Sequence, residues 1–178
     1  MNESDETDVR RDWMLLLDSD EPDEEPTQAP AVETIVGGWL VEDDGTIGRF
    51  ESNPLYQPRN PDSPTSAVDA AVKLVATDRA DVGLVLRTLR DSLVMVALDE
   101  TGDVAVATAP DGVACVVVAS GALDQSRVDA PQWRQVDLAE LVRLLPDGLD
   151  VLVNPGGPRS MRLLADALRE SVDANGAE

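Results

Sequence analysis

The chain contains no histidine, one cysteine (Cys115) and one lysine (Lys73) among its 178 residues. Without histidine it lacks the side chain most often used for acid-base chemistry near neutral pH and for binding transition metals. A lone cysteine excludes an internal disulfide and leaves a cysteine-based zinc site without a second ligand. We therefore expect no enzymatic activity, no metal and no cofactor. A reducing compartment fits best, with the cytoplasm as the default location.

Aromatic residues are scarce at 3%, so the hydrophobic core has to be built from Val, Leu and Ala. Long apolar runs are also missing, because no stretch approaches the roughly 18 to 20 residues of a membrane span. Met1 opens an acidic rather than a basic segment. We expect neither an integral membrane segment nor a secretory signal.

Positive charge is in short supply, with a net charge of -21 at pH 7 and a sequence pI near 4.1. This balance argues against nucleic acid as a partner, because phosphate binding depends on Lys and Arg. Much of the excess lies in residues 1–34, which combine a dense acidic run with Pro22, Pro26 and Pro30. Such a composition buries too little apolar surface to offset the entropy of ordering, so we predict a disordered acidic leader.

One apolar stretch interrupts this leader, between Asp12 and Asp18. It consists of Trp13, Met14, Leu15, Leu16 and Leu17. The stretch is typical of a hydrophobic anchor that folds on the groove of a partner protein. The alternative is a short strand or helix that packs back on its own domain. The sequence leaves open whether the anchor binds in cis or in trans.

Residues 35–64 predict a β-hairpin followed by a proline-rich connector. Asp44-Gly45 is a strong hairpin signal, because the turn needs positive φ and glycine supplies it. Trp39, a partner-binding candidate, can pair with Phe50 across the hairpin. The acidic residues here do not meet the spacing of an EF-hand loop, so we expect no calcium site.

Residues 65–172 predict the core of one α+β domain, before a frayed tail at 173–178. Helices are indicated from Thr65 or Ser66, over 78–91 and over 138–145, the last capped by Asp137, with a final helix over 163–172. Strands over 93–98, 104–108 and 113–119 read as an antiparallel meander, followed by strands at 133–136 and 150–153. Cys115 falls in the apolar run that we expect to be the central strand, and Trp133 is a further partner-binding candidate. The fold prediction is a single α+β domain with a mixed, mostly antiparallel sheet and helices packed on it.

The loop after the strand at 150–153 combines turn formers with one arginine. Its candidate partner-binding residues are Asn154, Pro155, Gly156, Gly157, Pro158 and Arg159. The layout of strand, glycine loop and helix suggests a phosphate site, but neither GxGxxG nor GxxxxGK[ST] is present. Pro155 and Pro158 also remove backbone donors. We interpret the loop as a rigid structural or protein-contact element.

The segment from Arg134 to Pro158 resembles the C-terminal half of the SseB-type domain, named after enhanced serine sensitivity. The shared features are a helix, the Pro146-Asp-Gly148 turn, a strand and the Asn154-Pro-Gly loop before a last helix. The resemblance extends over roughly residues 66–172. Actinobacterial domains of this kind are similar to proteins associated with type VII secretion, and the Arg-rich, nearly Lys-free composition fits a high-GC genome. The family supplies no established active site that can be carried over.

Three functional hypotheses follow from the sequence. The leading one is a cytoplasmic, non-enzymatic interaction protein, an accessory or chaperone-like factor for type VII secretion. The second is an immunity protein whose negative charge blocks a secreted basic toxin. The third is a small-anion-binding regulator that uses residues 154–162. Each predicts a different partner (secretion component, secreted substrate or toxin, or small anion), and the sequence determines neither that partner nor the oligomeric state.

Overall fold

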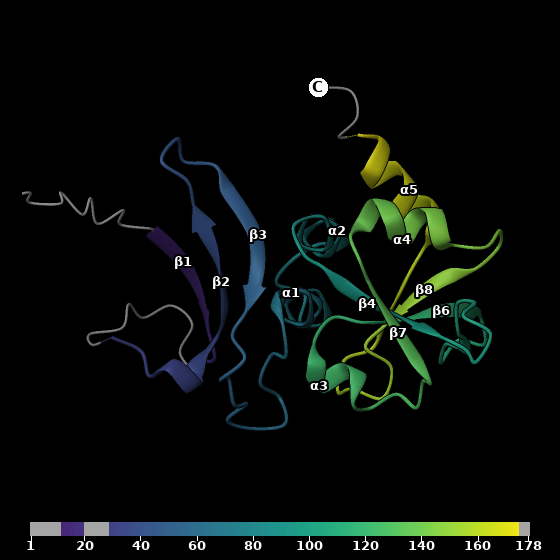
Figure 1. Ribbon diagram of the computed structural model, residues 1–178, viewed down its shortest axis with the longest axis horizontal. Coiled ribbons are helices and arrows are strands. Elements are labelled where there is room, and N and C mark those ends of the chain that lie inside the picture. The colour runs from purple at the N-terminus through teal and green to yellow at the C-terminus, as the bar shows by residue number, and fades with distance from the viewer. Residues whose placement is uncertain (1–11, 20–28, 175–178) are drawn as a thin grey trace, which may run out of the picture.

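The structure, a computed structural model, describes residues 12–19 and 29–174. Two β-sheets lie on either side of helices α1 and α2 (Figure 1). The strands are β1 (Asp12–Leu17), β2 (Ile35–Val41), β3 (Ile47–Ser52), β4 (Val94–Leu98), β5 (Val106–Thr108), β6 (Ala114–Ala119), β7 (Gln132–Val136), β8 (Asp150–Val153) and β9 (Met161–Leu163). The helices are α1 (Ala67–Ala76), α2 (Val82–Arg90), α3 (Ala122–Gln125), α4 (Leu138–Leu144), α5 (Ala165–Asp173) and the 3-10 helix η1 (Val32–Thr34).

The N-terminal sheet has the antiparallel order β1-β2-β3. The predicted hairpin is confirmed, because β2 and β3 meet at the Asp44-Gly45 turn, where Gly45 has φ +84°. Trp39 and Phe50 face each other across it, with ring centroids 4.9 Å apart and planes tilted by 60°. The backbone N–H of Phe50 donates to the carbonyl of Asp91 at 2.7 Å, which ties β3 to the end of α2.

The predicted disordered leader at 1–34, from which the Trp13–Leu17 stretch was excepted, contains two ordered segments. Asp12–Leu17 forms β1, which pairs with β2 from Asp12 opposite Val41 to Leu17 opposite Ile35. Val32–Thr34 forms η1. The acidic composition around the Trp13–Leu17 stretch gives no sign that β2, which follows later in the chain, offers it a partner strand. The structure therefore agrees with the second alternative, a short strand that packs on its own domain. The rest of the predicted leader at 1–11 and 20–28 lies outside the described residues.

The second sheet has the order β7-β4-β6-β8-β9, with β5 also paired to β6. Strand β6 is central as predicted, and Cys115 to Ala119 are all buried. It runs parallel to β8, whereas the other pairs in this sheet are antiparallel. The prediction of an α+β fold with a mixed, mostly antiparallel sheet is therefore confirmed.

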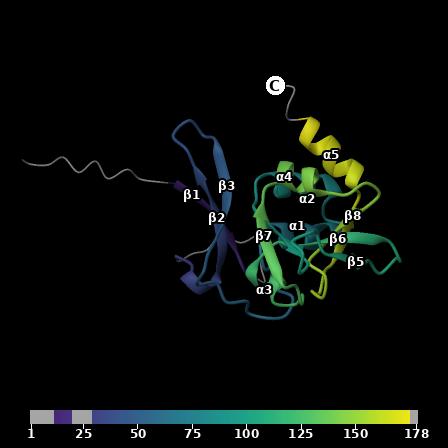
Figure 2. The same cartoon turned by 45° about the vertical axis from the view of Figure 1, so that its right-hand side comes forward.

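The expected meander of three successive strands is not formed. Strands β4 and β5 both run antiparallel to β6 and pair with successive parts of it, and β5 lies on the side of the molecule away from β1 (Figure 2). A turn follows β4, and Asp99 stabilises it. The Asp99 carboxylate accepts from the backbone N–H groups of Thr101 at 2.8 Å and Asp103 at 3.1 Å. Hydrogen bonds from Thr101 lower the pKa of Asp99. The sequence correctly predicted the turn between β4 and β5. The residues near this turn do not determine that both strands pair with β6.

The final helix begins later than predicted. Met161–Leu163 forms the short strand β9 on β8, and α5 starts at Ala165. Asp150 explains the change, because its carboxylate pairs with Arg162 at 2.5 Å and accepts from the backbone N–H of Ala165 at 2.9 Å. Of the predicted tail, Asp173 still belongs to α5, and residues 175–178 lie outside the described part of the chain.

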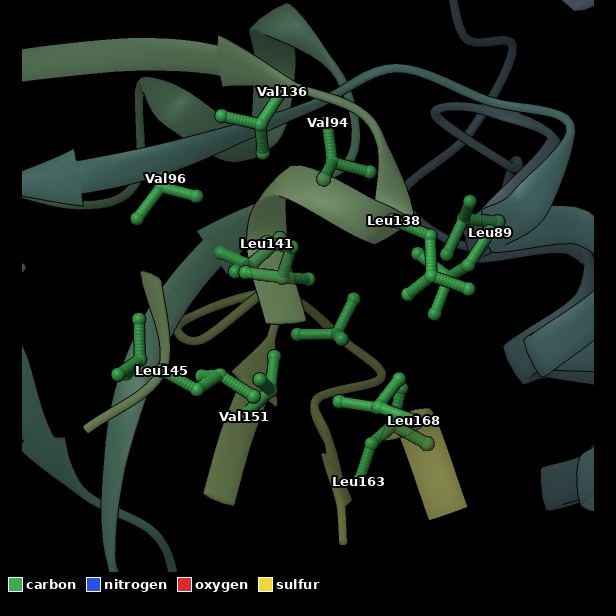
Figure 3. Packing of buried hydrophobic residues seen from close by; sticks show 14 of the residues in the cluster. Leu89, Val94, Val96, Val136, Leu138, Leu141, Leu145, Val151, Leu163 and Leu168 are labelled. Carbon is green, nitrogen blue, oxygen red and sulfur yellow. The ribbon is translucent and has the colours of Figure 1, made fainter. Parts of the chain in front are cut away.

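The main hydrophobic core lies between one face of the second sheet and α1, α2, α4 and α5. Figure 3 shows Val94, Val136 and Val151 of the sheet with Leu141 of α4 and Leu168 of α5. The residues predicted to cap α1 and α4 do so in the structure. The Ser66 hydroxyl accepts from the backbone N–H of Asp69 at 3.0 Å, and Asp137 accepts from that of Glu140 at 2.9 Å. The opposite sheet face has a smaller cluster of Ala109, Cys115 and Leu152.

Candidate interaction surface

Strand β1 places an apolar stretch at the edge of the N-terminal sheet. Trp13, Met14 and Leu15 are 40%, 45% and 43% exposed, although successive residues of a strand point to opposite faces. Within residues 12–19 and 29–174, no strand pairs with the outer side of β1. Its approach to β2 depends on Gly38, where a Cβ atom would lie 2.9 Å from the Met14 carbonyl oxygen. The result is an exposed hydrophobic edge strand, which natural proteins usually protect.

The other two residues of the predicted anchor, Leu16 and Leu17, are half-buried. They line a groove of about 430 Å³ together with Leu74 and Thr77 from the end of α1. Lys73 also lines this groove, where it pairs with Asp62 at 2.7 Å. The predicted anchor is therefore divided into an exposed first half and a second half packed beside α1.

Asp18 fastens the end of β1 to the proline-rich connector. Its buried carboxylate accepts from the Tyr56 hydroxyl at 3.2 Å and from the backbone N–H of Arg59 at 3.1 Å. The Tyr56 hydroxyl also lies 2.7 Å from the Pro64 carbonyl. Burial, followed by the charge of Asp18, raises the pKa of Tyr56 above its ordinary value of 10.0. These contacts fix one end of the candidate surface.

Acidic side chains gather at the opposite end of β1. Asp12 lies opposite Val41, and the following turn carries Glu42, Asp43 and Asp44, all four acids being exposed. Asp44 accepts from the backbone N–H of Thr46 at 2.8 Å, and hydrogen bonding to Thr46 lowers its pKa. Among the described residues, none of these carboxylates forms an ion pair. Four exposed carboxylates therefore gather at this end of the edge strand.

The loop at Asn154 is organised inward. Asn154 is 1% exposed and has φ +52°, and its side chain accepts from the Ser120 backbone N–H and donates to the Ser120 hydroxyl, both at 2.8 Å. Pro155 and Gly157 are half-buried, and only Gly156 and Pro158 are exposed. The prediction of a rigid structural loop fits this arrangement. As a partner contact, Asn154 itself is inaccessible.

Arg159 is also engaged within the molecule. Its side chain is 9% exposed, with one terminal nitrogen on the Asp62 carboxylate and the other 3.1 Å from Asp69 Oδ2. Arg162 pairs with Asp111 at 2.7 Å and with Asp150 at 2.5 Å. Both arginines of the proposed anion loop thus have carboxylate partners, which weakens the small-anion hypothesis.

A buried polar cluster joins this loop to α1, and sequence reasoning missed it. The Ser66 and Ser120 hydroxyls lie 2.7 Å apart, and Asp124 Oδ2 accepts from the Thr65 hydroxyl at 2.6 Å. Burial raises the pKa of Asp124, although Arg127 lies 2.8 Å from its other oxygen. The two serines belong to segments far apart in the chain, so no local pattern announces the cluster. It joins three segments, namely the start of α1, the end of β6 and the loop after β8.

Of the remaining candidates, Trp39 lies opposite Met14 of β1, whereas Trp133 and Cys115 belong to the second sheet. Trp39 is half-buried against Phe50, and Trp133 is half-buried on β7 opposite Ala97 in the other sheet. Cys115 is fully buried, and burial raises the pKa of its thiol, which disfavours the reactive thiolate. In the described parts of the chain, no group of three or more His, Cys, Asp or Glu residues could hold a metal ion.

Comparison of the chain with protein-family models, curated proteins and solved structures gave no significant match. Over the residues described, no helix has the length and apolar character needed to cross a membrane. The likeness to SseB-type domains accordingly stays a prediction from sequence motifs.

Proposed function

We propose that the protein is a non-enzymatic interaction domain that binds another protein through β1. The observation that carries this proposal is the exposed edge strand with Trp13, Met14 and Leu15 on its surface. Contiguous exposed apolar surface with a polar rim is typical of a protein-binding site. The acidic residues Asp12 and Glu42–Asp44 supply that rim at one end.

Several features support a role without catalysis. The chain has no histidine, and the hydroxyls of Ser66 and Ser120 contact each other and carboxylate or amide groups instead of a free general base. Cys115 lies in the core. These groups serve packing and positioning, which fits a scaffold whose function lies on its surface.

The biological setting that we propose is the cytoplasm, as an accessory or chaperone-like factor for type VII secretion. The support is the resemblance of residues 66–172 to SseB-type domains and the absence of any apolar run long enough for a membrane span. The net charge of -21 disfavours nucleic acid and favours a protein partner with a basic surface. The expected partner is a secretion component or a secreted substrate.

An immunity protein against a secreted basic toxin is the second candidate. The specific observation in its favour is the acidic group of Asp12 and Glu42–Asp44 beside the exposed strand, which forms no ion pair with a described residue, because such charge accelerates association with a basic surface. The two functions differ in the partner recovered. A single small toxin indicates immunity, and secretion components or their substrates indicate the accessory role.

Affinity purification from native lysate with matched baits tests the proposal. The wild-type chain is compared with the double variant Trp13→Ser/Leu15→Ser and with Val82→Ser/Leu164→Ser, which alters apolar residues that are 48% and 54% exposed outside β1. We expect a partner with the wild type and the control, and at least tenfold less with the β1 variant. Equal recovery with all three baits, with each shown to fold by circular dichroism, would contradict binding through β1.

A further inference from the structure

We propose that the outer edge of β1 binds by strand addition an extended segment of another protein, in which apolar residues alternate with lysine or arginine. This inference rests on the proposed function and adds a binding mode and a partner chemistry. The first argument is the backbone. In an edge strand, alternate N–H and C=O groups point away from the sheet and can pair with an incoming strand. β1 is six residues long, which suffices for such a ladder.

The side chains of β1 suit an apolar neighbour on both faces. Trp13 and Leu15 share the face of Gly38, which pairs with Leu15, whereas Met14 lies opposite Trp39 on the other face. All three β1 residues are at least 40% exposed. An added strand therefore covers apolar surface above and below the sheet, as cross-strand pairs do.

Charge selects the polar residues of the incoming segment. Asp12, Glu42, Asp43 and Asp44 surround one end of β1 and have no described cation within ion-pair distance. A segment with Lys or Arg near this end gains attraction, whereas an acidic segment is repelled. The groove at the other end of β1 is lined by two cations, Lys73 and Arg79, and two acids, Asp18 and Asp62, whose charges offset each other, so we place the basic residues of the partner at the Asp12 end.

A second copy of this chain is the competing occupant. Two β1 strands paired edge to edge would bring together chains that each carry a net charge of -21, with Asp12 of each near the Asp18 end of the other. Self-repulsion of that size opposes association at moderate ionic strength. The charge therefore favours a basic partner over a copy of the same chain.

The test uses the full-length chain and three synthetic ten-residue peptides. One alternates Val with Lys, one alternates Val with Glu, and the third is the Val/Lys peptide with a central Pro. Binding is followed by two-dimensional amide NMR and by amide hydrogen exchange. We expect the Val/Lys peptide to protect alternate amides of Asp12–Leu17 and to bind at least about tenfold more tightly than the other two. Protection confined to another region, or equal binding of all three peptides, overturns the proposal.

Matched charge variants test the electrostatic part. Glu42→Gln/Asp43→Asn removes two acids beside β1, and Glu100→Gln/Asp129→Asn removes two exposed acids elsewhere. We expect the first variant to bind the Val/Lys peptide about fivefold more weakly than the wild type, and the second variant to differ from it by less than about twofold. Added salt should weaken peptide binding by both variants, because it screens the remaining charges. Equal effects of the two variants would reject charge selection at β1.

Analytical ultracentrifugation of the chain without peptide tests whether a second copy of the chain, rather than another protein, occupies the edge of β1. A concentration-dependent dimer whose formation protects the β1 amides means that a copy of the chain occupies this edge, and it overturns the proposal. If no peptide binds but the Trp13→Ser/Leu15→Ser bait still loses its lysate partner, strand addition is rejected and the interaction function stands. Failure to recover any partner speaks against the function itself.

Discussion

Single buried polar residues determine how distant segments of this protein meet. Asn154, at the end of β8, holds the backbone of Ser120 at the end of β6, and Ser120 in turn contacts Ser66 before α1. Hydrogen bonds in such a buried network are strong, and leaving one partner unpaired is expensive. The predictions at this scale therefore concern Asn154 and the buried carboxylate of Asp124.

Asn154 has two separable roles, hydrogen bonding and positive φ. Asn154→Ala leaves the Ser120 N–H unpaired and puts alanine at φ +52°, so we expect the free energy of unfolding to fall by about 3 kcal/mol. Asn154→Gly loses the same hydrogen bonds but tolerates this backbone, and the loss should be about 2 kcal/mol. Urea denaturation measures both, with the exposed Ser160→Ala as a control. A glycine variant less stable than the alanine variant would contradict this account.

Asp124 and Asp137 should give opposite pH dependence. Burial raises the pKa of Asp124 above its ordinary value of 3.8, so its contribution to stability is largest below that value and is lost as the pH rises through the folded pKa. The hydrogen bond from the Glu140 N–H lowers the pKa of Asp137, so its contribution is present above pH 3.8 and is lost as the pH falls through its folded pKa.

Urea unfolding between pH 3 and 7 tests these signs. As the pH falls toward 4, the wild type should gain stability relative to Asp124→Asn. Over the lower part of the range, it should lose stability relative to Asp137→Asn, since the neutral Asn can still cap α4. Parallel slopes for the two variants would show that one of the two assignments is wrong.

At the scale of elements, the N-terminal sheet depends on close strand contacts. A Cβ atom at Gly37 would lie 2.3 Å from the Glu51 carbonyl oxygen and 2.4 Å from the Phe50 ring. Glycine at this position therefore lets β2 and β3 meet and allows Phe50 to lie against Trp39. The sheet that carries the candidate surface is thus sensitive to small changes in its middle strand.

Gly37→Ala should lower the free energy of unfolding by about 2 kcal/mol through overpacking. Gly48→Ala is the matched control, because its nearest atom is the Leu40 carbonyl oxygen at 3.4 Å, and we expect a change below about 0.5 kcal/mol. Urea denaturation compares them, and amide NMR shows whether β1 shifts with β2. Equal losses for the two variants would mean that strand contact at Gly37 is not limiting.

At the scale of the whole molecule, β1 is an addition to a core that does not contain it. The residues of the main hydrophobic cluster come from α1, α2, α4, α5 and the second sheet. Asp18, by contrast, joins β1 to Tyr56 in the connector. Removing the chain before residue 29 should leave the main core folded but release Tyr56 from burial and from the charge of Asp18.

This truncation should lower the pKa of Tyr56 toward its ordinary value of 10.0, because the two largest causes that raise it, burial and the charge of Asp18, are reduced. Tyr56 is the single tyrosine, so phenolate absorbance during alkaline titration reports it alone. Asp18→Asn, which removes the charge but keeps the strand, should give a smaller decrease. An unchanged titration in both proteins would show that β1 does not cover Tyr56 in solution.

Much of the fold could be predicted because its signals are local. The Asp44-Gly45 turn, the Ser66 and Asp137 caps and the central position of Cys115 each depend on neighbouring residues, and the structure has them. The pairing of β4 with β6, strand β9 and the Ser120 cluster depend on segments distant in sequence. Of the candidate site, the Trp13–Leu17 stretch was found from its composition, but its pairing with β2 was not.

By itself, the sequence determined the composition of the core, the strong negative charge, the absence of histidine chemistry and the positions of most turns and caps. These properties belong to residue types or to short stretches of chain. Only the tertiary structure decided that Trp13, Met14 and Leu15 form an exposed edge and that Asn154 and Arg159 face inward to Ser120, Asp62 and Asp69. Exposure and pairing depend on which distant segments meet in space, and a local pattern does not carry that information.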